Sequence, residues 1–478
     1  MNDDLKLTLG WIADAVRGRL RAGDPLREVG DIVSDSRTLA GGDFFVALRG
    51  PRFDGHAFVG EVLERGAAGA LVEAADTVGR TSPKPDGEGG SGPRLDGVIE
   101  VGDTLKGLQD LAHAVRMSVT TKVVAITGSA GKTTTKETIA ALLGDRFRLV
   151  KNKGNLNNHI GLPLSLMQLR TRPDVAVMEL GMNHAGEIST LVAIAEPDVR
   201  VWTNVGDAHL GFFASVDAIA DAKAEILERA RAETTLVCNA DDPLVMARAA
   251  RFVGRTTTFG VSAGAAVRAS DVEDRGLHGM RARVVTRSGE RQVEVPLLGR
   301  GNLYNVLAGI AVALELGVPL DEIVPRIARL QPASRRGAVR RLRGITLVDD
   351  SYNSSPSALR RALDVIAHDT EATRKVAILG EMLELGPHAV WLHEECGRAA
   401  AAAGLSLLVT VGGAPARAMA DAAVAAGMSA GSVRYFETSD RAAAVMASHV
   451  SAGDVVLVKG SRGIRTDIVA DRLAAEFA

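Results

Sequence analysis

Apolar runs alternate with helical patterns along the chain from residue 122 onward. The runs "KVVAIT", "DVAVMEL", "VRVWTNV" and "TTLVCNA" contain few polar residues, and helical stretches separate them. Such runs are typical of parallel strands that helices cover on both faces, because neither face of such a strand meets water. We therefore expect a mainly parallel α/β sheet in the middle of the chain.

The same alternation starts again after "QPASRRGAVRRL". The runs "ITLVDD", "KVAILG", "LSLLVTVG" and "DVVLVKG" are each followed by a helical stretch, most of them rich in alanine. This second series predicts a smaller doubly wound, Rossmann-like domain at the C-terminal end.

The first part of the chain has a different pattern. Short β-type runs ("FFVAL", "GALVE", "GVIEV") surround one helical pattern near 57–68, which predicts a small mixed α/β unit. The segment "GRTSPKPDGEGGSGPRLDG", residues 79–97, is rich in Gly, Pro and Ser and predicts a flexible loop. A length of 478 residues also favours about three domains, and we expect them over 1–116, 117–333 and 334–478.

Composition and charge narrow the function. The formal net charge of −2 argues against a general nucleic-acid binder, which needs a surplus of basic residues to neutralise phosphates. The two cysteines, Cys238 and Cys396, are far apart and indicate neither a disulfide framework nor a zinc site. The N-terminus does not look like a signal peptide, and no apolar run approaches the ~20 residues of a membrane span. We expect a cytoplasmic protein.

The stretch "VVAITGSAGKTTTKETI", residues 123–139, carries the clearest chemistry. A predicted strand runs into a glycine turn and then into a helix, which is the geometry that binds phosphate on backbone N–H groups. The full P-loop pattern has a further glycine where this chain has Ile126, so the shorter pattern Gly128-Ser129-Ala130-Gly131-Lys132-Thr133 remains, followed by Thr134. We expect Lys132 to reach the β- and γ-phosphates and the Thr133 hydroxyl to bind Mg²⁺.

Polar residues follow the next two predicted strands. Glu179 comes at the end of "DVAVMEL", and Asn204 and His209 come at and beyond the end of "VRVWTNV". Ligands gather at the carboxyl ends of parallel strands, and a carboxylate with an imidazole suits a second divalent ion. A lone acid in this place is more often a cap or a surface group. Lys223, in "DAIADAKAEI", is flanked by acids and by itself indicates a solvated helix face.

At this point the chain resembles the Mur ligases, the ATP-dependent amide-bond-forming enzymes of peptidoglycan precursor synthesis. The shortened loop "TGSAGKTTTKE" matches the loop of that family and accounts for the missing glycine. The resemblance covers essentially the whole chain, through "SDSRTLAGGDFFVALRGPRFDGHAF", "KGNLNNHIGLPLSL", "ELGMNHAGEI", "NVGDAHLGFF", "IADAKAEI", "VDDSYNSSP", "LGEMLELG" and "VLVKGSRG".

The resemblance implies a uridine-nucleotide domain, a central ATPase domain and a C-terminal domain that closes on ATP and binds an incoming dipeptide. Within the family it is closest to members that join D-alanyl-D-alanine to UDP-N-acetylmuramoyl-tripeptide through an acyl phosphate. It implies ATP and two Mg²⁺ ions, with Glu179 as a further ligand of the ATP-bound ion. A second ion would be held by His209 and by Lys223 as a carbamate, which requires a neutral lysine.

The resemblance also implies roles for other side chains. Asn305 matches an adenine-side asparagine, and Arg336 and Asp349 match residues that clamp the nucleotide from the C-terminal domain. Arg335 is an alternative to Arg336, which is preferred because "RGAV" follows it. The uridine-substrate residues are Ser36, Arg37, Asn155, Asn158 and His184, and the dipeptide residues are Tyr352 and Asn353.

The chain departs from the family at two places. The family usually has histidine where this chain has Gly301, and "YNANP" is "YNSSP" here, with Ser354 and Ser355. The general base stays open between His184, which is at least as well explained by substrate positioning, and the acids at 349–350. We expect His388 and His393 on a helix surface, and a monomer.

Three other functions fit the sequence less well. A ligase that adds the third amino acid carries a "DNPR" signature, which this chain lacks. A folylpolyglutamate synthetase shares the ATPase core but not the "SDSR…DGHAF" region. A non-catalytic nucleotide-binding relative is disfavoured because Lys132, Thr133, Glu179, His209 and Lys223 are all present.

Overall fold

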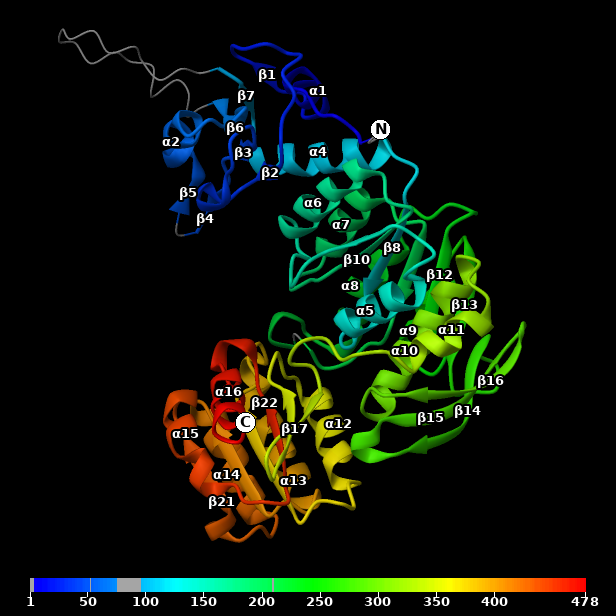
Figure 1. Cartoon of the computed structure of the whole chain (residues 1–478), viewed down its shortest axis with the longest axis vertical. Helices are drawn as coiled ribbons and strands as arrows, with labels where there is room; N and C mark the ends of the chain where they lie inside the picture. Colours follow the sequence, from blue (N-terminus) through cyan, green and yellow to red (C-terminus); the bar gives the residue numbers. More distant parts are fainter. Residues whose placement is uncertain (1–3, 52, 75–95, 209) are drawn as a thin grey trace, which may run out of the picture. The chain divides into compact units, whose positions relative to one another are not determined.

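The computed structural model describes residues 4–51, 53–74, 96–208 and 210–478 (Figure 1). Of the predicted loop at 79–97, only the last two residues lie within these ranges. The contacts between residues divide the chain into two compact units. One comprises Met1–Ala125, Asp145–Met182 and Glu187–Asp198, and the other Ile126–Gly144, Asn183–Gly186 and Val199–Ala478.

The first unit opens with a five-stranded sheet in the order β1-β7-β6-β3-β2. Its strands are parallel apart from β1, which pairs antiparallel with β7. The alternation of apolar residues buries Phe45, Ala70 and Val72 of the sheet against Val62 of a helix, as the mixed α/β pattern predicts. The elements are α1 (Leu9–Ala15), β1 (Arg19–Leu20), β2 (Ile32–Val33), β3 (Phe44–Val46), β4 (Arg49–Gly50), β5 (Phe53–Asp54), α2 (Val59–Glu64), β6 (Gly69–Glu73) and β7 (Val98–Val101).

The rest of the first unit contains a parallel pair of strands and three helices. Strand β9 (Leu149–Lys151) pairs with β10 (Val175–Glu179), which confirms the run "DVAVMEL" as a strand. Helix α4 (Thr104–Met117) begins at Asp103, whose side chain accepts from the Lys106 N–H. It packs against α6 (Gly161–Leu166) and α7 (Glu187–Ala195). The chain passes into the second unit within β8 (Lys122–Thr127).

The second unit begins with a sheet in the order β16-β15-β14-β13-β12-β11. The pairs β11–β12, β12–β13 and β13–β14 are parallel, whereas β14, β15 and β16 form an antiparallel extension that the apolar runs did not predict. The strands are β11 (Val199–Trp202), β12 (Thr235–Asn239), β13 (Arg255–Gly260), β14 (Val267–Asp274), β15 (Met280–Thr286) and β16 (Gly289–Val295). The helices are α5 (Lys132–Leu143), α8 (Val216–Ala224), α9 (Pro243–Ala249), α10 (Gly299–Glu315) and α11 (Leu320–Ile327).

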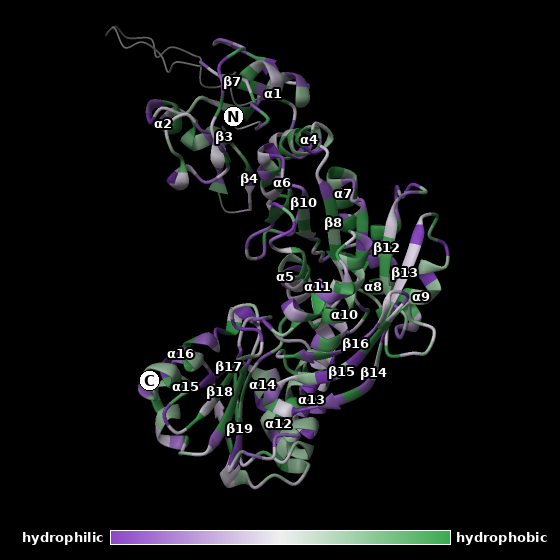
Figure 2. Cartoon of the chain, turned by 45° about the vertical axis from the view of Figure 1, so that its right-hand side comes forward, coloured by the Kyte–Doolittle hydropathy of each residue, from purple (hydrophilic) through white to green (hydrophobic). Residues whose placement is uncertain are grey.

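The C-terminal sheet, also in the second unit, has the order β17-β18-β22-β19-β20-β21 and is parallel except for β17. Neighbouring residues of one strand face opposite cores: Ala377 and Leu379 pack under α12, α13 and α14, and Val376 and Ile378 pack under α15 and α16. The hydrophobic colour in the middle of β19 in Figure 2 reflects this double coverage, and the predicted doubly wound fold is confirmed.

The strands of this sheet are β17 (Ala338–Arg341), β18 (Thr346–Asp350), β19 (Arg374–Gly380), β20 (Leu407–Val411), β21 (Val433–Phe436) and β22 (Asp454–Lys459). The helices that cover it are α12 (Pro356–Ala367), α13 (Ala389–Ala402), α14 (Ala414–Ala425), α15 (Ser439–Met446) and α16 (Asp467–Glu476).

One surface prediction is wrong. His393 is fully buried in α13. Both ring nitrogens have partners there, since Nε2 accepts the Met382 N–H at 2.8 Å and Nδ1 lies 2.6 Å from the Ala389 carbonyl oxygen. Within the described ranges, no helix is both long enough and apolar enough to cross a bilayer.

Candidate active site

The loop after β8 turns at two glycines whose geometry excludes a side chain. Gly128 has φ of 151° and Gly131, the residue before α5, has φ of 84°. A Cβ at position 128 would stand 1.9 Å from the Thr203 Oγ1, and one at 131 would stand 2.2 Å from the Asn305 Oδ1. Both positions therefore need glycine for their backbone angle and for space.

Residues that follow β11 hold this loop in place. The Asn204 Oδ1 accepts the Ala130 N–H at 2.9 Å, and its Nδ2 donates to the Ala130 carbonyl at 3.0 Å. The Gly206 N–H donates to the Ser129 Oγ at 2.9 Å, and the Thr203 Oγ1 donates to the Ala130 carbonyl at 2.8 Å. Asn204, which the sequence placed at a strand end, thus bonds to both the N–H and the C=O of Ala130 and holds the loop from the neighbouring strand.

Helix α5 starts immediately after this turn. Lys132, Thr133 and Thr134 form its first turn, where the helix dipole favours anions. The Lys132 Nζ donates to the Gly128 carbonyl at 2.8 Å, so its ammonium lies over the loop. This arrangement has the features of a phosphate-binding site.

Lys223 lies in α8 and is only 1% exposed. Burial, together with the positive charge of Lys132, holds the pKa of Lys223 well below its usual value. The solvated helix face that its acidic neighbours indicated is therefore wrong for this side chain. A buried amine that loses its proton readily fits the neutral lysine that carbamate formation requires.

Asn305 lies in α10, which packs against α5. Its Oδ1 accepts the Thr135 hydroxyl at 3.2 Å, and its Nδ2 donates to the Asn302 Oδ1 at 3.0 Å. With the Gly131 contact described above, these bonds fix Asn305 at the start of the phosphate-loop helix.

The two candidate arginines have different surroundings. Arg335 forms an ion pair with Asp471 at 2.9 Å and lies 3.9 Å from Asp349. The guanidinium of Arg336 instead lies over the ring of Tyr352, 4.2 Å from its centroid. Arg335 is thus held by carboxylates, whereas the neighbouring Arg336 stacks on a predicted dipeptide residue.

Asp349 and its neighbours at the end of β18 form a bonded cluster. Asp349 is buried and accepts the Ser351 Oγ–H at 2.5 Å. Lys459, at the end of β22, forms an ion pair with Asp350 at 2.6 Å and donates to the Asn353 carbonyl at 3.0 Å. The backbone of Asn353 is therefore anchored from the neighbouring strand. Lys459 had no sequence signal beyond its place in "VLVKGSRG".

In the first unit, Ser36 and Arg37 lie in a short 3₁₀ helix, Ser36–Thr38. Asp35 caps this helix and accepts from the Arg37 guanidinium at 2.7 and 2.9 Å. The Arg37 side chain, through these hydrogen bonds, lowers the pKa of Asp35 to about 2. Asp35, which the sequence patterns did not single out, thus fixes the orientation of the exposed Arg37 guanidinium.

Glu179 ends β10 in the same unit and is 4% exposed. Its Oε1 accepts the Asn157 Nδ2–H at 2.8 Å, and the Asn152 carboxamide bonds to its backbone N–H and C=O at 3.0 and 3.2 Å. The sequence pointed to two other asparagines of this segment. The Asn158 Oδ1 accepts the Gly161 N–H at the start of α6, and Asn155 is exposed. The run "NLNNHI" signals this cluster but not which member orients Glu179.

His184, in the second unit, packs against Phe212 with ring centroids 5.2 Å apart. His209 lies outside the described residues. Across the ranges that are described, no group of three or more His, Cys, Asp or Glu side chains gathers as a metal site. Within the second unit, the hydroxyl of Thr133 is an oxygen donor of the kind that Mg²⁺ prefers.

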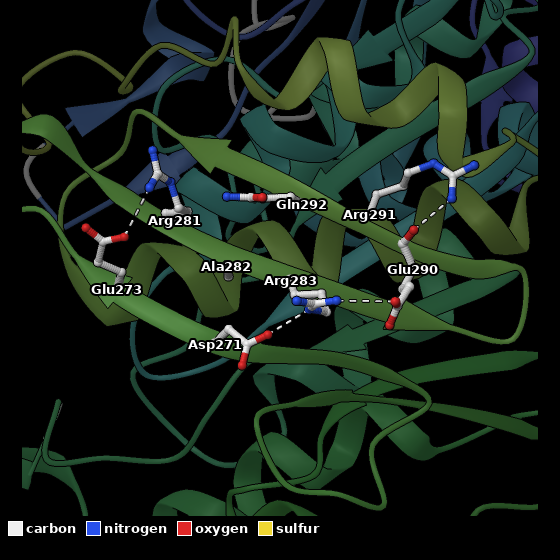
Figure 3. Close-up of a pocket in the computed structure, with 8 residues that line it drawn as sticks. All are labelled: Asp271, Glu273, Arg281, Ala282, Arg283, Glu290, Arg291 and Gln292. Carbon is white, nitrogen blue, oxygen red and sulfur yellow. Dashed lines mark hydrogen bonds and ion pairs between the residues drawn. The ribbon is translucent and has the colours of Figure 1, made fainter.

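A shallow pocket on the strands β14, β15 and β16 lies outside this constellation (Figure 3). Its charges are paired across strands: Arg283 bonds to Asp271 at 2.7 Å and Glu290 at 3.3 Å, and Arg281 bonds to Glu273 at 3.4 Å. Such pairs stabilise an exposed sheet face, and we assign this pocket no part in the chemistry.

Three family models match the chain in order. The model of the Mur ligase family, catalytic domain, matches residues 28–116, that of the Mur ligase middle domain matches 126–313, and that of the Mur ligase, glutamate ligase domain, matches 334–462.

Known proteins match over nearly the whole length. The chain is 33% identical to the UDP-N-acetylmuramoyl-tripeptide--D-alanyl-D-alanine ligase of Bacillus subtilis, covering 99% of this chain and 100% of the relative. It is similar to the crystal structure of MurF from Acinetobacter baumannii, with TM-score 0.85, 30% identity and coverage of 99% and 100%. It also matches MurF ligase of Thermotoga maritima in complex with ADP, with TM-score 0.80, 29% identity and coverage of 94% and 97%.

Proposed function

Because the chain belongs to the Mur ligase family, we propose that it joins D-alanyl-D-alanine to UDP-N-acetylmuramoyl-tripeptide, converting ATP to ADP and phosphate in peptidoglycan precursor synthesis. The observation that carries the proposal is the end-to-end match to a ligase of that name, at 33% identity over 99% of the chain. The ATP-type phosphate loop around Gly131 supplies the chemistry that such a ligase needs.

The reaction needs ATP because a peptide carboxylate is a poor electrophile. A carboxylate oxygen attacks the γ-phosphorus and ADP leaves, which gives an acyl phosphate. The amine nitrogen of D-alanyl-D-alanine then attacks the acyl carbon, phosphate leaves, and the nitrogen loses a proton. The amine therefore displaces phosphate from the acyl carbon, and phosphate is a much better leaving group than the oxide of an unactivated carboxylate.

The first step brings two anions together. Two like unit charges about 4 Å apart repel by ~4 kcal/mol at an effective dielectric of 20. Lys132 and the N-terminus of α5 offset this repulsion at the phosphates. Because Asn204 already fixes the loop, these donors need little reorganisation when ATP binds.

Magnesium would supply further positive charge at the phosphates when bound. We assign Thr133 and Glu179 to the ATP-bound ion, and His209 with carbamylated Lys223 to a second ion. The lowered pKa of Lys223 supports this assignment, because only the neutral amine takes up CO₂. The carbamate would offer oxygen atoms, which Mg²⁺ prefers.

The substrates are assigned to the remaining candidates. Asn305 would border the adenine, and Arg336 and Asp349 would clamp the nucleotide from the C-terminal domain. Tyr352 and Asn353 would position the dipeptide. Five residues would bind the uridine substrate: Ser36, Arg37, Asn155, Asn158 and His184. The stacking of Arg336 on Tyr352 supports a link between the nucleotide and dipeptide sites.

The organisation of the protein completes the proposal. The three domains would span 1–116, 117–333 and 334–478, and the ligase would act as a cytoplasmic monomer. Size-exclusion chromatography with light scattering tests the monomer directly, since a dimer would double the 50.0 kDa mass.

Phosphate release from Mg-ATP tests the reaction. Turnover that requires both UDP-N-acetylmuramoyl-tripeptide and D-alanyl-D-alanine supports the proposed function. Turnover with UDP-N-acetylmuramoyl-dipeptide and free diaminopimelate instead would move the protein to the preceding step of the pathway.

A further inference from the structure

Helix α10 has an open position one turn before Asn305. Gly301 and Asn305 are four residues apart and therefore share one face of the helix. Asn305 on this face contacts the phosphate loop at Gly131 and α5 at Thr135. A side chain from another element that packs against Gly301 is thus next to the proposed nucleotide site, because Gly301 has no side chain of its own.

Arg361 of α12 occupies that space. Its Cδ and Nε lie 3.5 and 3.6 Å from the point where a Cβ on Gly301 would stand, which is ordinary van der Waals contact. A planar, nitrogen-rich group from another helix therefore lies beside the position that Gly301 leaves without a side chain. The Arg361 side chain thus lies where Gly301 has no side chain of its own.

The placement of α12 is well defined. Leu298, beside the start of α10, packs in one apolar core with Leu359, Leu363 and Ile366 of α12. The Asp207 carboxylate accepts the Ser357 hydroxyl at 2.7 Å and pairs with Arg360 at 3.3 Å. Arg361 is thus presented to α10 by a helix that is docked along its length.

Arg361 differs from its neighbour in having no fixed partner. Arg360 is paired with Asp207, whereas Arg361 makes no hydrogen bond or ion pair with any residue in the described ranges, and it is exposed. Desolvation by the surrounding protein lowers the pKa of Arg361, as does the charge of Arg360, while the carboxylates of Asp207 and Asp350 act in the opposite direction. An arginine remains charged under such conditions, so a free cationic plane lies beside the site.

We propose that the guanidinium of Arg361 contacts the adenine base of ATP, in the place that Gly301 leaves open. A guanidinium is planar and stacks on aromatic faces, which suits a purine ring as an imidazole does. Arg361 is then a nucleotide-contact residue donated by the C-terminal domain. The inference rests on the proposed ATP site, and it adds to that site a residue that the sequence motifs did not single out.

Nucleotide affinity of the full-length protein tests the proposal. Calorimetry would give the dissociation constants of ADP, ATP and inorganic tripolyphosphate for wild type, Arg361→Ala and the control Arg398→Ala, an exposed arginine on α13 of the same domain. We expect Arg361→Ala to weaken ADP and ATP binding equally, by about tenfold, with tripolyphosphate unchanged. Unchanged ADP affinity, or an equal loss for tripolyphosphate, would overturn the base contact.

A double-mutant cycle tests whether the two positions share one space. Gly301 has no left-handed backbone angle, so a histidine can be introduced there without backbone strain. We expect Gly301→His to weaken ADP binding when Arg361 is present and to restore it in the Arg361→Ala background. The same effect in both backgrounds would contradict the proposal.

These binding measurements need no ligase substrates. If ADP binds as expected but no substrate pair gives turnover, the proposed function fails while the Arg361 contact stands. If turnover is normal but the variants bind ADP like wild type, the Arg361 contact fails alone.

Discussion

The carboxamide oxygen of Asn305 lies 2.2 Å from the point where a Cβ on Gly131 would stand. Two segments 174 residues apart in the chain therefore close on each other at the start of α5. The contact leaves no room for a side chain, and it makes the phosphate loop depend on α10.

Gly131→Ala should disrupt this contact. The residue has φ of 84°, so alanine adds backbone strain as well as the clash. We expect ADP binding to weaken by at least about tenfold and the unfolding free energy to fall by about 1–2 kcal/mol. Isothermal titration calorimetry and denaturant unfolding measure the two effects.

Gly317→Ala is the matched control, because Gly317 has φ of 78° but no atom lies within 4 Å of the point where its Cβ would stand. It should lose about 1 kcal/mol of stability with no loss of ADP binding. Equal ADP affinity in the Gly131 variant and in wild type would rule out the proposed nucleotide position.

Lys132→Ala should remove the ammonium that lies over the loop. Because its charge acts on the phosphates during transfer, we expect kcat to fall by about 10³-fold while the fold is retained. Steady-state phosphate release together with circular dichroism measures both. Full ATP-dependent activity in this variant would refute the assigned site.

Lys223→Met should separate activity from stability. The folded state lowers the pKa of Lys223, so between that pKa and the usual 10.5 the unfolded chain binds more protons than the folded one. The unfolding free energy of wild type should therefore rise with pH over this window, relative to the variant. We expect Lys223→Met to be inactive as a ligase yet at least as stable as wild type at pH 7.

Denaturant unfolding of both proteins at several pH values, in EDTA and carbon dioxide-free buffer, measures this difference. The stability advantage of the variant should shrink as the pH approaches 10.5. A variant that is less stable than wild type at pH 7 would show that burial does not disfavour the charged amine.

The two cysteines should be inert in the native protein. Burial raises the pKa values of Cys238 and Cys396 from 9.0 to about 12, so the folded state disfavours the reactive thiolate. Stability should accordingly fall as the pH rises from about 9 towards 12. At pH 8, a chromogenic disulfide reagent should label neither thiol before unfolding and both afterwards; rapid labelling of native protein would contradict this burial.

The sequence predicted the parallel parts of the fold well, because a strand covered on both faces is apolar throughout. The runs at β8, β12, β19 and β22 all became strands within a residue or two of the quoted ends. The antiparallel extension β14–β16 was missed, since its exposed face carries charges such as Arg281, Arg283 and Glu290 that interrupt the apolar pattern. Strands of that kind are recognised by alternation rather than by continuous apolar runs.

For the site, the motif pointed to Gly131 and Lys132 and the family resemblance to Asn305, which the fold brings together, but local pattern could not predict burial. Lys223 is flanked by acids in sequence and is nevertheless enclosed in the fold. His393 is likewise buried because a backbone N–H from the loop after β19 needs its Nε2. Asn157, which bonds to Glu179, was missed because the choice among neighbouring asparagines depends on the turn before α6.

The most direct test of the proposed reaction is phosphate release from Mg-ATP by wild-type protein with each substrate alone and with both. We predict turnover only when UDP-N-acetylmuramoyl-tripeptide and D-alanyl-D-alanine are present together, and turnover slower by about 10³-fold for Lys132→Ala. Turnover that ignores D-alanyl-D-alanine, or that needs diaminopimelate and the dipeptide precursor instead, would contradict the proposed reaction.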